Sequence, residues 1–324
     1  LGEAVEQFGR DRRTEIVDPD ELPVFDAVEV ADDVADEPCV VTLSTSGQVG
    51  RLPAEGGKRA TPGRHDVLVD SVLTRTTSTV TAVTSEGRAL QVLAAELADG
   101  EGRARGAGAT QAFGTNRGES ILTLVADGEE YLVVVTAQGV AKRLTLDEVR
   151  GTKAGKPLLK LKAGDRVVAA FTAPDGVDVA MVASDGQVLR TSVDGISVQG
   201  RGAAGVAGMK MRSGATVVAA CPVLADDALI TVTDDGCVKA TPIAEFEAKG
   251  RGGVGIRATK LAVDASLTTA HVGPTMGLLA VMASDADRKK ADPTPVPLML
   301  EATGRDLVST ASERQILALG PARW

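Results

Sequence analysis

The chain has 324 residues, of which 44% are apolar and only 2% are aromatic, and its formal net charge is −9. So few aromatic side chains argue against a protein that stacks single-stranded bases on rings or encloses a ligand in an aromatic pocket. Two histidines and three scattered cysteines argue against a zinc site and a disulfide-rich secreted scaffold. The apolar runs are too short to span a membrane, so we expect a cytoplasmic protein without metal or cofactor.

The N-terminal residues 1–14 are expected to be the end of a helix. Apolar side chains in Leu1–Phe8 follow helical spacing, and Gly9 stands where such a helix would stop. The chain has no initiator methionine and no signal peptide, so we expect a fragment of a longer protein whose preceding part packs on this helix.

Residues 15–38 form an acidic segment. They contain ten Asp and Glu residues and no Lys or Arg, whereas residues 39–324 contain 31 acidic and 32 basic residues. The negative charge therefore belongs to one segment beside a nearly neutral body. Two interpretations remain open, a solvated linker and a strap that competes with nucleic acid for a basic surface.

A repeated hairpin pattern occupies residues 39–324. Short runs rich in β-branched residues meet at a glycine turn and lead into a second strand, which is the signal for a β-hairpin. The turn glycines are Gly47, Gly87, Gly139, Gly186 and Gly236, with a weaker copy at Gly304. Repeats of about 50 residues with several strands each indicate a propeller, and six units fit the length.

Basic side chains recur at two places in the repeat. One place lies three or four residues after the turn glycine, at Arg51, Lys142, Arg143, Arg190 and Lys239. The other is a glycine-rich basic loop, at residues 102–108, 152–156, 201–211 and 249–257. Glycines let a backbone approach phosphate closely, and Arg and Lys supply charge, so these loops predict a curved track for bent duplex DNA. The alternative is that they are solvated turns between blades.

The sixth unit differs from the others. Leu278–Ser284 has the pattern of a strand, but the charged and proline-rich residues 285–297 have the composition of an insertion. The sixth hairpin can therefore turn near Asp285 or near Gly304. No glycine-rich loop follows Ser312, so closure of the ring is open at this point.

The sequence FGRDRRTEI at Phe8–Ile16, the hairpins and the Gly-Arg/Lys loops resemble the C-terminal β-pinwheel domain of the A subunit of bacterial type IIA topoisomerases, DNA gyrase and topoisomerase IV. The resemblance implies an all-β, six-bladed, hairpin-invaded propeller over residues 39–324, with an atypical sixth blade and a short N-terminal helix tail. It further implies a basic perimeter that binds and bends double-stranded DNA without strong sequence preference. The implied partners are the ATPase B subunit and the rest of the A subunit of a heterotetramer.

Catalysis is expected outside this chain. The family that it resembles cleaves DNA with a tyrosine beside an arginine and a metal-binding carboxylate cluster. The single tyrosine, Tyr131, lies in a predicted strand, and no GxxxxGK[ST] loop is present. We therefore expect a non-catalytic domain of an ATP-dependent type II DNA topoisomerase.

The glycine-rich loops depart from the gyrase pattern. Gyrase A subunits carry a Gln-x-Arg-Gly-Gly-Lys-Gly box after the first hairpin, where residues 54–64 read AEGGKRATPGR. A better match lies in the fifth unit, where Lys249–Gly255 reads KGRGGVG. The incomplete first box favours DNA binding and bending of the topoisomerase IV type. The alternatives are full chiral wrapping, as in gyrase, or a protein-interaction propeller that binds no DNA.

The residues expected to contact DNA come from these loops and hairpins. They are Lys58, Arg59, Arg103, Arg105, Lys142, Arg143, Lys153, Lys156, Arg190, Arg201, Lys210, Lys239, Lys249, Arg251, Gly252, Gly253, Gly255 and Arg257. Concentration of these bases on the rim favours DNA, whereas scattering among acidic residues favours a protein-interaction module.

Overall fold

The computed structural model describes residues 34–61, 63, 66–126, 131–150, 155–224, 227–283 and 295–321. The chain divides into two compact units, Leu1–Ala35 and Asp36–Trp324, and every strand described below belongs to the second. The predicted helix tail in residues 1–14 and most of the acidic segment lie outside the described residues. No helix in the described ranges is long and apolar enough to cross a membrane.

The predicted hairpins are present, and glycine makes their turns. Between β8 (Tyr131–Thr136) and β9 (Val140–Thr145), Gly139 has φ 80° and its amide donates to the carbonyl of Thr136 at 2.9 Å. This left-handed conformation is open to glycine without a steric cost. Residues 132–135 of β8 are completely buried, which explains why the strand is apolar on both faces.

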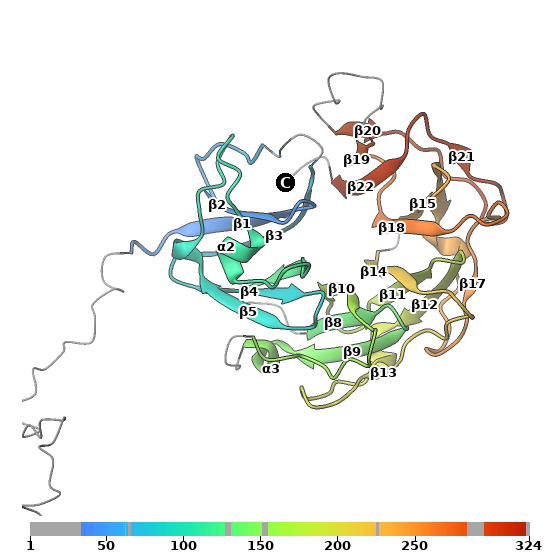
Figure 1. Ribbon diagram of the computed structural model, residues 1–324, viewed down its shortest axis with the longest axis horizontal. Coiled ribbons are helices and arrows are strands. Elements are labelled where there is room, and N and C mark those ends of the chain that lie inside the picture. The colour runs from blue at the N-terminus through green and yellow to red at the C-terminus, as the bar shows by residue number, and fades with distance from the viewer. Residues whose placement is uncertain are drawn as a thin grey trace, which may run out of the picture. The chain divides into compact units, whose positions relative to one another are not determined.

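Six antiparallel sheets follow one another around a common centre (Figure 1). From the inner strand outward, the first three blades are β3 (Leu68–Arg75), β1 (Pro38–Ser44), β2 (Gln48–Pro53) and β6 (Ala107–Gly108); β7 (Ile121–Val125), β4 (Thr79–Thr84) and β5 (Ala89–Leu93); and β10 (Val167–Thr172), β8, β9 and β13 (Val206–Ala207). The last three are β14 (Val217–Val223), β11 (Asp178–Ala183), β12 (Gln187–Ser192) and β17 (Ile256–Arg257); β18 (Leu267–Gly273), β15 (Ala228–Thr233), β16 (Cys237–Pro242) and β21 (Thr310–Ala311); and β22 (Ile316–Pro321), β19 (Leu278–Met282) and β20 (Val296–Leu298). Short helices follow some hairpins: α2 (Ala109–Phe113), α3 (Leu146–Arg150) and the 3₁₀ turns η2 (Ala94–Glu96), η3 (Val193–Gly195) and η4 (Ile243–Glu245).

The fourth strand of four blades is supplied by the next blade. Strand β13 lies between β12 and β14 in sequence, yet it pairs with β9 of the preceding blade through Val206 opposite Ala141. Strands β6, β17 and β21 make the same exchange. We call the connections from outer hairpin strand to inner strand the rim segments; they are residues 54–67, 94–120, 146–166, 193–216, 243–266 and 299–315. This exchange is the hairpin invasion of a six-bladed pinwheel, so the predicted fold is confirmed.

The sixth blade is atypical, as predicted. Strand β19 pairs with β20, so its hairpin reverses between Met282 and Val296, the first of the two registers considered. Gly304 lies in the following rim segment instead. Within the described residues the sheet has three strands, and β20 is only three residues long.

Five buried hydrophobic clusters fill the junctions between consecutive blades. Val133 and Met181, for example, lie in the cluster between the third and fourth blades, and Ile230 and Ala280 lie in that between the fifth and sixth. The other clusters join the first blade to the second, the second to the third and the fourth to the fifth. Burial of apolar surface at these junctions holds the ring together.

Candidate nucleic-acid interface

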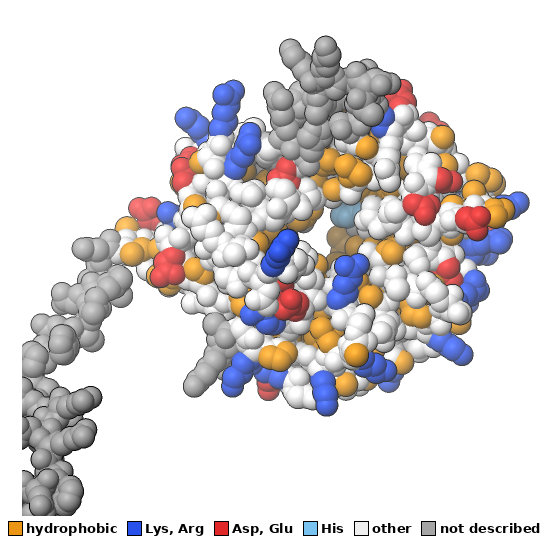
Figure 2. Space-filling model, viewed as in Figure 1, with side chains coloured by type: hydrophobic (Ala, Val, Ile, Leu, Met, Phe, Trp, Pro, Cys, Tyr) orange, Lys and Arg blue, Asp and Glu red, His pale blue; other side chains and the backbone are white. Residues whose placement is uncertain are grey.

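Nine of the predicted contact residues are exposed, and all nine lie on the first five rim segments. They are Lys58, Arg59, Arg103, Arg105, Lys156, Lys210, Lys249, Arg251 and Arg257. Figure 2 shows Lys and Arg side chains projecting from the outer edge of the ring around much of its circumference. Of the nine, only Arg257 has an ion pair with a described residue, an exposed contact of 3.5 Å to Asp306. The other eight have no ion-pair partner among the described residues, although the guanidinium of Arg251 also donates to two backbone carbonyls.

Hydrogen bonds join the first rim segment to the second and the fourth to the fifth. The amide of Gly102 donates to the carbonyl of Arg59 at 3.1 Å, which links the first two segments. The amide of Lys210 donates to the carbonyl of Gly253 at 2.9 Å, which links the fourth and fifth. Arg251 adds a side-chain link, because its Nε and Nη1 donate to the carbonyls of Gly195 and Ala207 at 2.7 and 3.2 Å. These bonds fix the spacing between cationic side chains that are distant in sequence.

The glycines of the fifth rim segment have structural roles. The amide of Gly252 donates to the carbonyl of Gly208 at 2.6 Å, so this donor is already used and does not face a phosphate. The carbonyl of Gly253 accepts from Lys210, as described above. Gly255 has φ 85°, and a Cβ there would lie 2.4 Å from the carbonyl oxygen of Val188. Gly255 thus allows the loop to pack closely against β12, and the amide of Gly252 is occupied within the protein. Contact of these three glycines with DNA stays a prediction.

Lys142 and Lys239 are buried instead of facing the rim. The Nζ of Lys142 donates to the carbonyls of Leu158, Arg201 and Ala203 at 2.7, 3.0 and 2.9 Å. Burial lowers the pKa of Lys142 to about 8. Because all three donors are occupied inside the protein, the predicted phosphate contact of Lys142 is wrong.

Lys239 repeats this arrangement in the fifth blade. Its Nζ donates to the carbonyls of Ala258, Arg305 and Leu307 at 3.0, 2.8 and 2.9 Å. Burial likewise lowers the pKa of Lys239. It too is a structural residue, and its predicted contact with DNA is wrong.

Arg143 and Arg190 are held by carboxylates of the protein. The buried guanidinium of Arg143 pairs with Asp175 and Asp194 and lies 3.9 Å above the ring centre of Tyr131. The Nε of half-buried Arg190 donates to Asp178 at 2.7 Å. We therefore exclude both arginines from the candidate DNA surface.

Arg201 and Lys153 complete the predicted set. Arg201 is half-buried, burial lowers its pKa, and its Nε and Nη2 have no hydrogen-bond partner within the described part of the chain. Lys153 lies outside the described residues.

Two exposed lysines at equivalent positions were missing from the sequence prediction. Lys160 and Lys260 stand 50 residues before and after Lys210, and all three are exposed at the ends of their rim segments. Each is followed four residues later by a residue with positive φ, Gly164, Gly214 or Asp264. The regular spacing was visible in the sequence and could have identified them.

Nothing in the described ranges indicates a metal centre, because no group of three or more His, Cys, Asp or Glu side chains could hold an ion there. The features that remain are exposed cations on a curved series of loops. Such a surface can bind a polyanion through its backbone charges.

Most of the ring is similar to known proteins in sequence or structure. The family model described as DNA gyrase C-terminal domain, beta-propeller, matches residues 130–174, 178–223 and 227–273, which are the third to fifth blades. The DNA gyrase A subunit of Staphylococcus epidermidis is 30% identical over 225 residues, 64% of this chain and 25% of that protein. The DNA gyrase A subunit of Leptospira biflexa is 29% identical over 219 residues, 63% of this chain and 26% of that protein. The chain thus spans about a quarter of the length of these relatives.

Solved structures share the fold. A crystal structure of the C-terminal domain of DNA topoisomerase IV superimposes with a TM-score of 0.76 at 21% identity, covering 89% of this chain and 95% of that one. A structure of a DNA gyrase A C-terminal domain gives a TM-score of 0.64 at 20% identity, covering 88% of this chain and 99% of that one.

Proposed function

Because the chain belongs to the family of C-terminal β-propeller domains of gyrase A-type topoisomerase subunits, we propose that it binds and bends duplex DNA along its rim segments. The observation that carries the proposal is a set of eight exposed cations on five consecutive rim segments, none of them ion-paired with a described residue. Hydrogen bonds join the first of these segments to the second and the fourth to the fifth. A curved row of charges lowers the free energy of a bent duplex through counterion release, without reading base edges.

The proposed role is accessory and not catalytic. The single tyrosine, Tyr131, begins β8, and its ring packs against the guanidinium of Arg143. This structural role supports placing strand cleavage outside this chain. In the proposed parent enzyme, an ATP-dependent cytoplasmic topoisomerase, the domain presents a transport segment to the ATPase B subunit and the rest of the A subunit.

We infer binding and bending of the topoisomerase IV type in preference to full chiral wrapping. The first rim segment retains Gly56, Gly57 and Lys58 but lacks the remaining residues of the gyrase box. A plasmid relaxed by a separate topoisomerase while this protein is bound should therefore show little change in linking number. A large change of one sign would assign gyrase-type wrapping.

Fluorescence anisotropy with a labelled duplex tests DNA binding directly. We expect binding that tolerates changes of sequence and weakens steeply as salt rises, with a slope set by the number of phosphates contacted. Arg103→Gln and Lys249→Gln should each reduce the slope of log K against log salt by about 1. Arg75→Gln is the matched control, because Arg75 is exposed and pairs with Asp36 away from the rim segments.

Two results would contradict the proposal. One is duplex binding that does not depend on salt or is absent at low salt, which would favour the protein-interaction propeller. The other is an equal effect of Arg75→Gln and the two rim variants, which would place the DNA elsewhere on the domain.

A further inference from the structure

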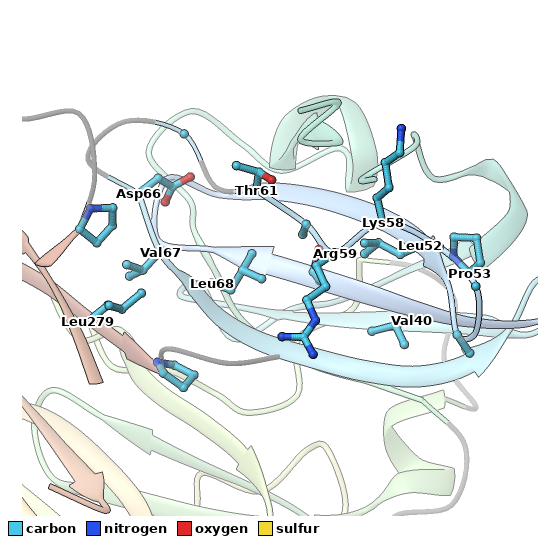
Figure 3. Close-up of a pocket in the computed structure, with 18 residues that line it drawn as sticks. Val40, Leu52, Pro53, Lys58, Arg59, Thr61, Asp66, Val67, Leu68 and Leu279 are labelled. Atoms are coloured by element: carbon cyan, nitrogen blue, oxygen red, sulfur yellow. The ribbon is translucent and has the colours of Figure 1, made fainter. Parts of the chain in front are cut away.

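A cavity of about 560 Å³ lies where the sixth blade meets the first (Figure 3). Its first-blade wall includes Val40, Leu52, Val67 and Leu68, and its sixth-blade wall includes Leu279 and Pro321. These side chains are apolar, so the cavity has the character of an unfilled hydrophobic core. Its volume lies within the range of small-molecule sites.

This junction differs from the other five. Each of the others contains a buried hydrophobic cluster, whereas the described residues form none here. The inner strands do meet, because a Cβ on Gly320 would lie 2.4 Å from the carbonyl oxygen of Leu68. Farther out, the first rim segment turns toward the second blade, and Thr61 donates its amide to the carbonyl of Gly102 at 2.8 Å. In the outer part of the junction, the apolar side chains of the two blades therefore do not pack against each other as they do at the other junctions. The missing van der Waals contacts are energetically unfavourable.

One cationic side chain extends across this cavity. Figure 3 shows Arg59 passing over the first-blade strands between Leu68 and Val40, whereas Lys58 points away. Arg59 is exposed and has no ion pair with the residues that the structure describes. The Asp66 carboxylate, also in the lining, is turned to the first hairpin, where it accepts hydrogen bonds from the Thr45 and Ser46 hydroxyls, both at 2.6 Å. The guanidinium of Arg59 is thus the charge of the site that has no ion-pair partner among the described residues.

We propose that this cavity binds a small amphipathic organic anion. Its apolar body packs between the two blades, and its carboxylate or sulfonate pairs with Arg59. Charge complementarity selects an acid over a neutral hydrocarbon, because a guanidinium donates charge-assisted hydrogen bonds to an oxyanion. Arg59 also belongs to the proposed DNA surface, so the experiments contain no DNA and measure binding of the anion alone.

Two dyes with closely similar aromatic bodies test the proposal on the whole chain. 8-Anilino-1-naphthalenesulfonate carries the negative charge, and N-phenyl-1-naphthylamine carries none. We expect both to gain fluorescence with saturable binding, and 2-naphthoate or decanoate to displace them. Arg59→Gln should weaken binding of the sulfonate by about three- to tenfold and leave the neutral dye unchanged.

Two further variants separate the cavity from general surface binding. Leu279→Trp fills the space from the sixth-blade wall and should abolish binding of both dyes. Arg103→Gln removes an exposed arginine outside the lining and should change neither dye. Because Arg59 is exposed, its variant should keep the circular dichroism spectrum of the wild type, which keeps the test decisive if Leu279→Trp misfolds.

Three outcomes would overturn the proposal. The first is unchanged sulfonate binding in Arg59→Gln. The second is dye binding that neither organic acid displaces. The third is a chain ending at Pro321 that binds the sulfonate more than tenfold more tightly, which would assign the cavity to residues 322–324.

Discussion

Lys142 and Lys239 each use a single ammonium group to join two rim segments. Lys142 binds carbonyls at residue 158 and at residues 201 and 203, so one charge connects segments that are more than 40 residues apart. Lys239 makes the equivalent connection between Ala258 and residues 305 and 307. A buried ammonium is tolerated only when its hydrogens are all donated, which is satisfied in both cases.

The lowered pKa of Lys142 predicts a pH dependence of stability. Burial is the main cause of the shift to about 8 from the ordinary value of 10.5; the negative charge of Glu148 opposes it and the positive charge of Arg201 adds to it. Between these pH values the unfolded chain binds more protons than the folded chain, so the contribution of Lys142 to the free energy of unfolding rises with pH.

Urea unfolding of wild type and Lys142→Met at pH 7.5 and 9.5 checks this expectation. The difference in unfolding free energy, wild type minus variant, should increase by about 1–2 kcal/mol at the higher pH. Groups titrating in both proteins cancel in the difference. A difference that stays constant or falls would show that Lys142 is not the titrating group.

At the scale of elements, three of the four two-residue fourth strands depend on the glycine before them. Gly106, Gly205 and Gly255 precede β6, β13 and β17, and their φ angles are 72°, 84° and 85°. A Cβ at these glycines would lie 1.9, 2.8 and 2.4 Å from carbonyl oxygens of the preceding blade. Both the left-handed conformation and the close approach exclude a side chain.

Gly255→Ala should therefore lower the free energy of unfolding by about 1–3 kcal/mol, because the strand must shift or the backbone must adopt a strained conformation. Gly250→Ala is the matched control in the same loop, where an added Cβ meets no atom within 4 Å. Thermal and urea unfolding of the two variants measure the difference. Equal stability of both would mean that the contact between Gly255 and Val188 does not hold β17.

At the scale of the whole molecule, acidic and basic side chains occupy different places: many acidic ones are bonded within the ring, and many basic ones are exposed on the rim segments. Many acidic side chains within the ring are used internally: Glu119 pairs with Arg88, and Asp70 accepts from the Thr123 hydroxyl at 2.6 Å and the Leu124 amide at 2.8 Å. The eight predicted rim cations without an ion-pair partner among the described residues are exposed, as are Lys160 and Lys260. A net charge of −9 is thus compatible with a cationic perimeter.

Deletion of residues 15–33 tests the role of the acidic segment while retaining Asp36, whose side chain pairs with Arg75. We expect duplex affinity to stay within about twofold, because an acidic block usually acts as a solvated linker. A chain with Asn and Gln in place of the acidic residues in 15–33 separates charge from length. If both changes tighten binding more than about tenfold at low salt, the segment is instead a strap that competes with DNA.

The repeat was readable in the sequence because its signals are local. Gly139 and Gly236 occupy hairpin turns with positive φ, as the alternation of apolar residues around them indicated. Exposure of Arg103 and Lys249 on rim segments also followed from local glycine-rich composition. The burial of Lys142 did not, because the strand and carbonyls that cover it come from residues about 60 positions later.

The sequence by itself determined the first five hairpins and the charge of the loops, since turn chemistry and strand alternation act over a few residues, whereas it left two positions open for the sixth hairpin. Tertiary structure decided which cations remain exposed and where the ring leaves a cavity. Strand exchange between blades covers some lysines and arginines and leaves others in solvent. Closure of the ring brings residues 40–68 of the first blade next to residues 279–321 of the sixth. The cavity between their apolar side chains is visible only in the tertiary structure. Both outcomes depend on contacts between distant segments, which local residue preferences do not encode.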